Sequence, residues 1–470
     1  MLHIINHVNL YTILLFTAIT MKGIKVPYVI LVLVLLCESY CKETLSFVIH
    51  MASVGAKYPE KVKGDWFTLP GAITPVGMRQ LYLLGRQLRQ RYVEEHHLLN
   101  EQYNQQQLTF RAPYSTNKAP CTAAYAFASG LYMPGTGYSL SQFQIKRAVP
   151  PTNFTDYKEY QNELRDAALL HYFASVPIMS LTEVPNYPLE AADYCPNIKN
   201  IVDNYRDNDA KYKSIISDRE KVYQSKLYPA MRRVLSNENI IHSLDEAMNY
   251  RDYILSARHF AHPLNGDLSD QEYFLLSQLY ETKQYLEYLG DVKVAQLISN
   301  GALLEINDTL QNIGVPDPDV PSKVMISYIV PDLNILAMLK LLEFNGVQEK
   351  PVTVPYASSL QMEIYNTENN EYIVKILYNN ETIPWKHQAP TASLEEFKKW
   401  INANLLADFK GDCVGSTSDE VSSSWITISL IIGAVVLVIV GIVFFLLLRD
   451  RKAAAAKMEN ADTEAPTTTV

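Results

Sequence analysis

Short, almost wholly apolar runs along the chain alternate with longer stretches in which apolar residues recur every three or four positions. The apolar runs have the length of β-strands. They predict a sheet built from residues 45–53, 107–112, 323–330, 359–365 and 372–378. Helical stretches separate the first three runs, which is typical of buried strands in an α/β fold. The last two runs alternate polar and apolar residues around an Asn- and Glu-rich turn, which predicts a hairpin.

Helical patterns dominate two regions. Residues 74–92 begin with Thr74, a good N-cap, and Pro75, which fits the first helical position. Between residues 152 and 290 strand patterns are scarce, and the predicted helices are 157–173, 199–235, 242–262 and 270–297. One further helix is predicted at 333–343, directly after an apolar strand.

An uncharged stretch at residues 425–448 predicts a membrane span. As a helix its 24 residues would be about 36 Å long, enough to cross a bilayer core of about 30 Å. A basic cluster follows it directly, made up of Arg449, Arg451 and Lys452. Because basic residues favour the cytosolic side, the pattern predicts a single-pass type I protein with a cytosolic tail at 449–470. The small polar residues of 414–424 predict a flexible stalk.

Residues 1–41 have the pattern of a secretory signal region. A short basic stretch that begins at Met21 precedes an apolar run and the small residues next to Cys41. The sequence is compatible with translation starting at Met1 or at Met21. The domain that follows is therefore expected outside the cell or in an endolysosomal lumen. Three glycosylation sequons agree with export, at Asn153, Asn307 and Asn380.

The charge balance excludes one class of partner. The chain has 41 basic and 50 acidic residues, a formal net charge of −9. Nucleic-acid binding needs a basic footprint, so no nucleic-acid partner is expected. No Cys or His spacing typical of a metal site occurs, and the chemistry considered below needs no cofactor.

The loop after the first strand carries the most specific motif. Residues 53–59, Ser-Val-Gly-Ala-Lys-Tyr-Pro, resemble the Arg-His-Gly-X-Arg-X-Pro loop of the histidine acid phosphatases, branch 2 of the histidine phosphatase superfamily. Gly55 and Pro59 match this pattern. The second Arg, the first Arg and the nucleophilic His are replaced here, by Lys57, Ser53 and Val54 respectively.

The resemblance covers about residues 44–413 and includes the helix at 74–92, Gly-Leu-Tyr-Met-Pro-Gly at 130–135 and the strands from Pro355. The chain resembles the membrane-anchored, protist-type members of the family, and its own catalytic motifs are degenerate. The resemblance implies a mostly parallel central sheet flanked by helices, with an inserted helical cap subdomain. The expected division is an α/β phosphatase-like domain at 42–151 and 291–413 and a cap at 152–290.

The family's reaction requires six functional groups. A neutral imidazole attacks phosphorus, three Arg and a second His hold the phosphoryl oxygens, and an Asp protonates the leaving oxygen. By the resemblance, Arg111 matches the third Arg and Asp332 the proton donor, while Pro331 replaces the second His. Lys57 offers a point charge instead of a guanidinium fork. With three groups lost, the sequence predicts a catalytically inactive relative that acts by binding, with a phosphorylated or anionic small molecule as candidate ligand.

Three alternatives stay open from the sequence. Arg111 either points into the cleft or lies on the surface at a strand end. Asp332 is either a retained proton donor or a plain N-cap of the following helix. His50 is either an ordinary strand histidine or an alternative nucleophile in a working acid phosphatase. A further possible function is that of a structural surface glycoprotein, and no protein partner is indicated.

The cysteines of the exported region are Cys121, Cys195 and Cys413. The resemblance implies a long-range disulfide between Cys195 and Cys413. Cys121 is then an odd thiol, either buried and inert or paired with Cys41.

Overall fold

The computed structural model describes most of the predicted exported domain. The described residues are 43–58, 70–113, 119–151, 157–179, 189–235, 267–311, 313, 323–343, 354–386 and 389–415, with scattered residues at 243–254 and 440–452. Almost all of the predicted span at 425–448 lies outside them, as do the signal region, Cys41, Pro59 and Asn153. Within the part of the chain that is described, no helix is both long and apolar enough to cross a membrane.

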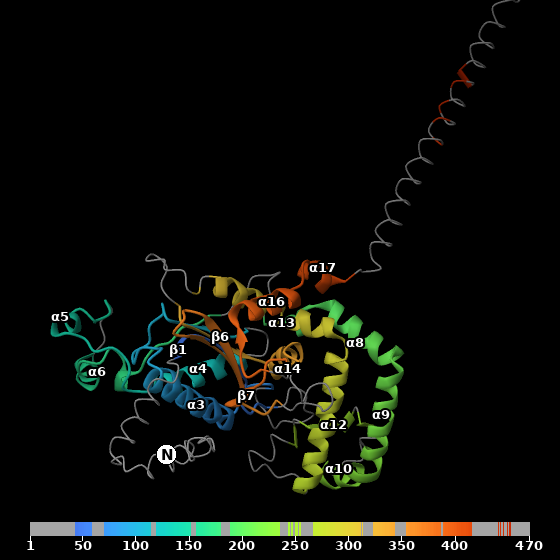
Figure 1. Cartoon of the computed structure of the whole chain (residues 1–470), viewed down its shortest axis with the longest axis horizontal. Coiled ribbons are helices and arrows are strands. Elements are labelled where there is room, and N and C mark those ends of the chain that lie inside the picture. Colours follow the sequence, from blue (N-terminus) through green and yellow to red (C-terminus); the bar gives the residue numbers. More distant parts are fainter. Residues whose placement is uncertain are drawn as a thin grey trace, which may run out of the picture. The chain divides into compact units, whose positions relative to one another are not determined.

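In the described part of the chain, eight strands form one sheet in the order β3-β2-β4-β1-β5-β6-β7, with β8 paired to β6. Figure 1 labels β1, β6 and β7 of this sheet. Their bounds are β1 (Thr44–Ser53), β2 (Leu108–Arg111), β3 (Ile178–Met179), β4 (Met325–Val330), β5 (Ser359–Asn366), β6 (Tyr372–Tyr378), β7 (Glu381–Ile383) and β8 (Ala392–Ser393). Neighbours among β1 to β4 run parallel, and the remaining pairs are antiparallel. The predicted strands and the α/β class, with a largely parallel sheet flanked by helices, are confirmed.

Helices cover both faces of the sheet. On one face, α3 (Pro75–Arg89) and α4 (Ala119–Leu131) pack on the strand residues that include Val48, Ala52 and Phe110. On the other face, α13 (Val292–Gln311), α14 (Asp332–Leu341) and α16 (Leu394–Asn404) pack on neighbouring residues of the same strands. Burial on both faces explains why β1 and β4 are nearly continuous apolar runs.

Helix α3 begins as predicted. Thr74 is its N-cap and accepts a hydrogen bond from the backbone N–H of Gly77 at 3.0 Å, and Pro75 follows at the first position. The helix continues into the π-helical turn η2 (Gln90–Glu95). The buried positions of α3 recur at helical spacing and include Leu81 and Leu88.

The region 152–290 is mostly helical where it is described, as predicted, but it also contributes a strand. Its helices are α6 (Tyr157–Leu164), η3 (Leu170–Tyr172), α7 (Ala191–Tyr194), α8 (Pro196–Asn208), α9 (Ala210–Val222), η4 (Tyr223–Leu227), α10 (Tyr228–Leu235) and α12 (Asp270–Leu289). β3 pairs with β2 and extends the sheet, so this segment is not a purely helical insertion. A two-residue strand has too short a pattern to be detected in the sequence. Helices α8, α9, α10 and α12 lie beside the sheet (Figure 1), and α8 and α12 contribute Ile198, Val202 and Leu289 to the core that packs on it.

The remaining described helices are α5 (Gln142–Ile145) and α17 (Phe409–Val414).

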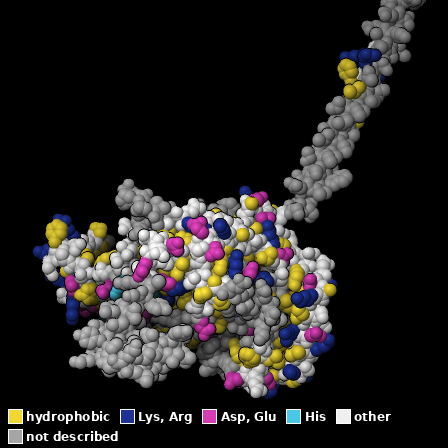
Figure 2. All heavy atoms as spheres, viewed as in Figure 1, with side chains coloured by type: hydrophobic (Ala, Val, Ile, Leu, Met, Phe, Trp, Pro, Cys, Tyr) yellow, Lys and Arg dark blue, Asp and Glu magenta, His cyan; other side chains and the backbone are white. Residues whose placement is uncertain are grey.

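Basic and acidic side chains are interspersed over the coloured surface in Figure 2. Among the described residues on this face, the basic side chains form no continuous stripe of the kind that nucleic acids need.

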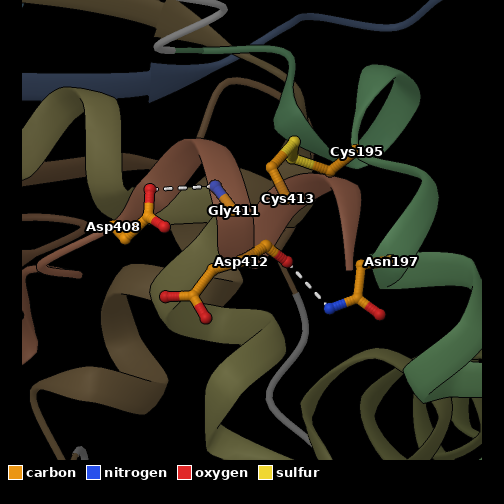
Figure 3. Close-up of a disulfide and its surroundings, with 6 residues drawn as sticks. All are labelled: Cys195, Asn197, Asp408, Gly411, Asp412 and Cys413. Atoms are coloured by element: carbon orange, nitrogen blue, oxygen red, sulfur yellow. Dashed lines mark hydrogen bonds between the residues drawn. A yellow bond between two sulfur atoms is a disulfide. The ribbon is translucent and has the colours of Figure 1, made fainter. Parts of the chain in front are cut away.

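A disulfide joins Cys195, between α7 and α8, to Cys413 in α17 (Figure 3). The two Cα atoms are 4.8 Å apart, and the bond closes a loop with a sequence separation of 218. Beside it, the side-chain amide of Asn197 donates to the backbone oxygen of Asp412 at 2.8 Å. The predicted pairing is confirmed, and in the chain-entropy model such a loop contributes about 5 kcal/mol.

Cys121 is not bonded to another described cysteine. Its thiol donates to the backbone oxygen of Pro113 at 3.4 Å, and burial raises the pKa of the thiol. A raised pKa lowers the thiolate fraction, which agrees with an unreactive thiol.

One charged network lies inside the fold. Glu363 of β5 is fully buried and accepts hydrogen bonds from Arg91 at 2.6 and 2.7 Å, one to each carboxylate oxygen. The hydroxyls of Tyr92 and Tyr365 each donate to it at 2.8 Å. Burial alone would raise the pKa of Glu363, but the hydrogen bonds and charge of Arg91 and the two hydroxyls lower it overall. The carboxylate is thus fully paired in the interior.

Candidate functional site

The predicted site residues follow the carboxyl ends of three neighbouring parallel strands. β1 ends at Ser53, β2 at Arg111 and β4 at Val330, and Ser53 is in register with Val330. Ligands of open α/β sheets usually bind at this edge. The fold therefore brings the loop after β1, Arg111 and the start of α14 to one edge of the sheet.

The loop after β1 is held by α3 rather than left open. A Cβ atom on Gly55 would lie 2.3 Å from the backbone oxygen of Gly77, so only glycine fits there. The backbone N–H of Ala56 donates to Oε1 of Gln80 at 2.9 Å, and the Thr74 hydroxyl donates to the oxygen of Ala56 at 2.7 Å. The match of Gly55 to the family's motif thus has a packing reason that requires no ligand.

Val54, which the sequence predicts at the nucleophile position, is part of the hydrophobic core. Its side chain is only 6% exposed and belongs to the cluster packed under α3 and α4. Its backbone oxygen accepts from the N–H of Ala357 at 3.1 Å. An aliphatic side chain has no lone pair with which to attack phosphorus.

Ser53, at the first Arg position, has a structural role. Its hydroxyl donates to the backbone oxygen of Pro355 at 3.0 Å and accepts from the N–H of Ser358 at 2.9 Å. The residue is 1% exposed. Ser53 therefore fastens β1 to the segment before β5 and provides no charge.

Lys57, at the second Arg position, is half-buried. Its backbone forms an isolated antiparallel bridge with Ile73, which precedes α3. This bridge fixes the backbone of the loop after β1 against the segment before α3.

Arg111 is neither a plain surface residue nor an open phosphate ligand. Its Nε and Nη2 donate to the same oxygen, Oε1 of Glu305 in α13, at 2.9 and 2.8 Å. The hydroxyl of Tyr328 in β4 donates to the other oxygen, Oε2, at 2.9 Å. The two charged side chains are 15% and 22% exposed. Burial, followed by the charge of Glu305 and its hydrogen bond, raises the pKa of Tyr328 well above its usual range.

Glu305 was missed by the sequence reasoning. It follows Leu303 and Leu304 and precedes Ile306, in a helix whose buried residues recur at Ile298, Ala302 and Ile306. A carboxylate this close to a buried helical face was the available signal, because acidic residues are rarely buried without a partner. Its partner Arg111 lies 194 residues earlier in the chain, so no local sequence pattern could identify the pair.

Pro331 and Asp332 lie at the start of α14. Pro331 is the N-cap residue and Asp332 the first helical residue, so Asp332 is not the N-cap that one alternative expected. Its Oδ1 accepts from the N–H of Leu333 at 2.9 Å. A carboxylate in the first turn is favourable because it faces the positive end of the helix dipole. Pro331 carries no side-chain donor for a phosphoryl oxygen.

His50 lies in the middle of β1 and is fully buried. Its Nδ1 lies 2.8 Å from the Ser327 hydroxyl, its Nε2 lies 3.1 Å from the Ser359 hydroxyl, and its ring stacks on Phe127. Desolvation by burial lowers the pKa of His50 to about 3. Both ring nitrogens are occupied and no substrate reaches them, so the structure favours an ordinary strand histidine.

In the described ranges, no group of three His, Cys, Asp or Glu side chains could hold a metal ion.

Known proteins resemble this chain in sequence and in fold. A lysosomal acid phosphatase from Xenopus laevis is 22% identical over 400 residues, covering 83% of this chain and 82% of that protein. One from Homo sapiens is 21% identical over 388 residues, with 79% and 80% covered. A Citrobacter braakii phytase structure has a TM-score of 0.54 and 14% identity, covering 79% of this chain and all of that one. The profile of the histidine phosphatase superfamily (branch 2) matches residues 42–379, and the chain therefore belongs to this superfamily.

Proposed function

We propose that this protein is a membrane-anchored glycoprotein whose phosphatase-like domain does not hydrolyse phosphomonoesters and acts by binding. The observation that carries the proposal is the side chain at the nucleophile position, because Val54 is packed in the core. Loss of a covalent nucleophile typically lowers kcat by a factor on the order of 10^6. The neutral Ser53 and Pro331 add to this loss, since both lack the donor that holds a phosphoryl oxygen in the family.

A working acid phosphatase is the second candidate, favoured by the names of the lysosomal acid phosphatases that are similar to this chain. It would need another nucleophile, and His50 is the histidine closest to the loop. The hydrogen bonds of both its ring nitrogens and its burial speak against that role.

A phosphate-release assay separates the two candidates. We expect purified full-length protein in detergent to release no phosphate from p-nitrophenyl phosphate above a mock preparation between about pH 4 and 7, where carboxylates and histidine titrate. Acid quenching with labelled substrate should trap no phospho-enzyme. Turnover that disappears in the His50→Gln variant would contradict the proposal and identify His50 as the nucleophile.

The location is part of the proposal. An endolysosomal lumen or the cell surface agrees with the lysosomal relatives and with the sequons. Asn380 lies exposed in the turn between β6 and β7, where a glycosyltransferase could reach it, while Asn307 is half-buried within α13. Protease added outside intact cells should remove the domain at 42–413 and spare the tail at 449–470. Digestion of the tail instead would reverse the proposed orientation.

The candidate ligand of this proposal is a phosphorylated or anionic small molecule. The Arg111 guanidinium is already paired with a carboxylate of the same chain, so such a ligand would have to bind without it.

A further inference from the structure

The Arg111 guanidinium is bound by a carboxylate from a distant part of the sequence, and a tyrosine hydroxyl binds the same carboxylate. Glu305 of α13 supplies the carboxylate, and Tyr328 of β4 orients it through the second oxygen. Arg111 and Tyr328 are register partners on adjacent parallel strands, so both side chains lie on the face of the sheet that α13 covers. Three elements of the fold thus meet at this contact.

The contact has the chemistry of a phosphate complex with the anion supplied internally. Guanidinium groups bind carboxylate and phosphate oxygens through the same charge-assisted N–H donors. Here Nε and Nη2 both donate to the carboxylate of Glu305, at 2.9 and 2.8 Å. The pair is mostly shielded from solvent, where such contacts are less screened than on the surface.

A phosphate dianion on Arg111 would therefore meet two obstacles. It would have to displace Glu305 from the guanidinium, and the displaced carboxylate would repel it at close range. The Tyr328 hydroxyl, which is buried, would lose its acceptor when Glu305 moved.

We propose that Glu305 is an internal anion that takes the place of the phosphoryl group on Arg111, so that the Arg111 guanidinium does not bind phosphate or phosphomonoesters. The proposal rests on the proposed function, because a working phosphatase would need Arg111 for its substrate. In this proposal Glu305, a residue outside the loop after β1, prevents phosphate from binding to Arg111.

The test is calorimetric titration of inorganic phosphate into the full-length protein in detergent at pH 7. Glu305→Gln removes the charge and keeps an oxygen that can accept from Tyr328. We expect this variant to bind phosphate at least tenfold more tightly than the wild-type protein. Asp308→Asn is the matched control, because Asp308 is exposed on the same helix one turn further along, and its affinity should equal that of the wild type.

A second variant shows whether the gain involves Arg111. In the double variant Glu305→Gln/Arg111→Met the affinity should return to the wild-type value. A gain that survives the loss of Arg111, or equal affinities of Glu305→Gln and wild type with both folded, would overturn the proposal.

A single variant made in the wild-type protein tests the inference independently of the stability of Glu305→Gln. Arg111→Met alone should leave the phosphate affinity unchanged, and a tenfold loss would show that phosphate reaches Arg111 despite Glu305. The assay of phosphate release reports separately on the proposed function. Absent turnover together with an affinity that Glu305→Gln does not change would refute this inference alone.

Discussion

The Val54→His variant is expected to show no phosphatase turnover above background. The new imidazole would sit at the end of β1 with no arrangement of donors to hold a phosphoryl group against it, and phosphoryl transfer depends mainly on positioning and charge stabilisation. Ser53 is neutral, Pro331 has no donor, and Arg111 is bound to Glu305. The measurement is phosphate release from p-nitrophenyl phosphate, with Val54→Leu as a variant that keeps an aliphatic core.

Restoring all the lost groups in one variant is limited by the space available around residue 53. Ser53→Arg, Val54→His and Pro331→His are the smallest set that returns the three lost groups, and Glu305→Gln would be needed to release Arg111. Residue 53 is 1% exposed and its hydroxyl bonds the segment at 355–358, so an arginine there must displace that segment. We expect the combined variant to be less stable than the wild type in chemical denaturation. Turnover by Val54→His alone would contradict this account, because it would show that a phosphoryl group is held without these residues.

The Glu363→Leu variant is expected to lose about 3–5 kcal/mol of the free energy of unfolding. Removing one member of a buried pair leaves the other charge uncompensated, and this is among the most damaging single changes. Here the change leaves the Arg91 guanidinium and the hydroxyls of Tyr92 and Tyr365 without their acceptor. Urea denaturation at pH 7 measures the loss, and Glu371→Leu, an exposed position on the hairpin between β5 and β6, is the matched control.

A double-mutant cycle and the pH dependence of the free energy of unfolding test why Glu363→Leu is destabilising. If the loss comes from the unpaired charge, Arg91→Leu combined with Glu363→Leu should cost less than the sum of the single changes. The pKa of Glu363 is lower in the folded than in the unfolded state. Its contribution to stability is therefore present above the unfolded pKa of about 4.3 and is lost as the pH falls below it. Additive single losses would contradict the pairing explanation.

Local patterns determined much of the fold in advance. The apolar run of β1, the Thr74-Pro75 start of α3 and the alternation of β5 and β6 are set by residues two to four positions apart, so they can be read along the chain. The resemblance to a family added the pairing of Cys195 with Cys413. It also identified the changed positions after β1.

Only the tertiary structure decided what the retained residues do. Arg111 matches the family, yet its partner Glu305 lies 194 residues away, on a helix that packs on the sheet. His50 is held by serines on the two strands that flank β1, and Glu363 by groups from η2. Such contacts depend on strand order and helix packing, which periodicity within one segment does not encode. The sequence by itself therefore predicted which groups of the family's chemistry are missing, and the fold decided that Arg111, predicted as a remaining one, is bound to a carboxylate of its own chain.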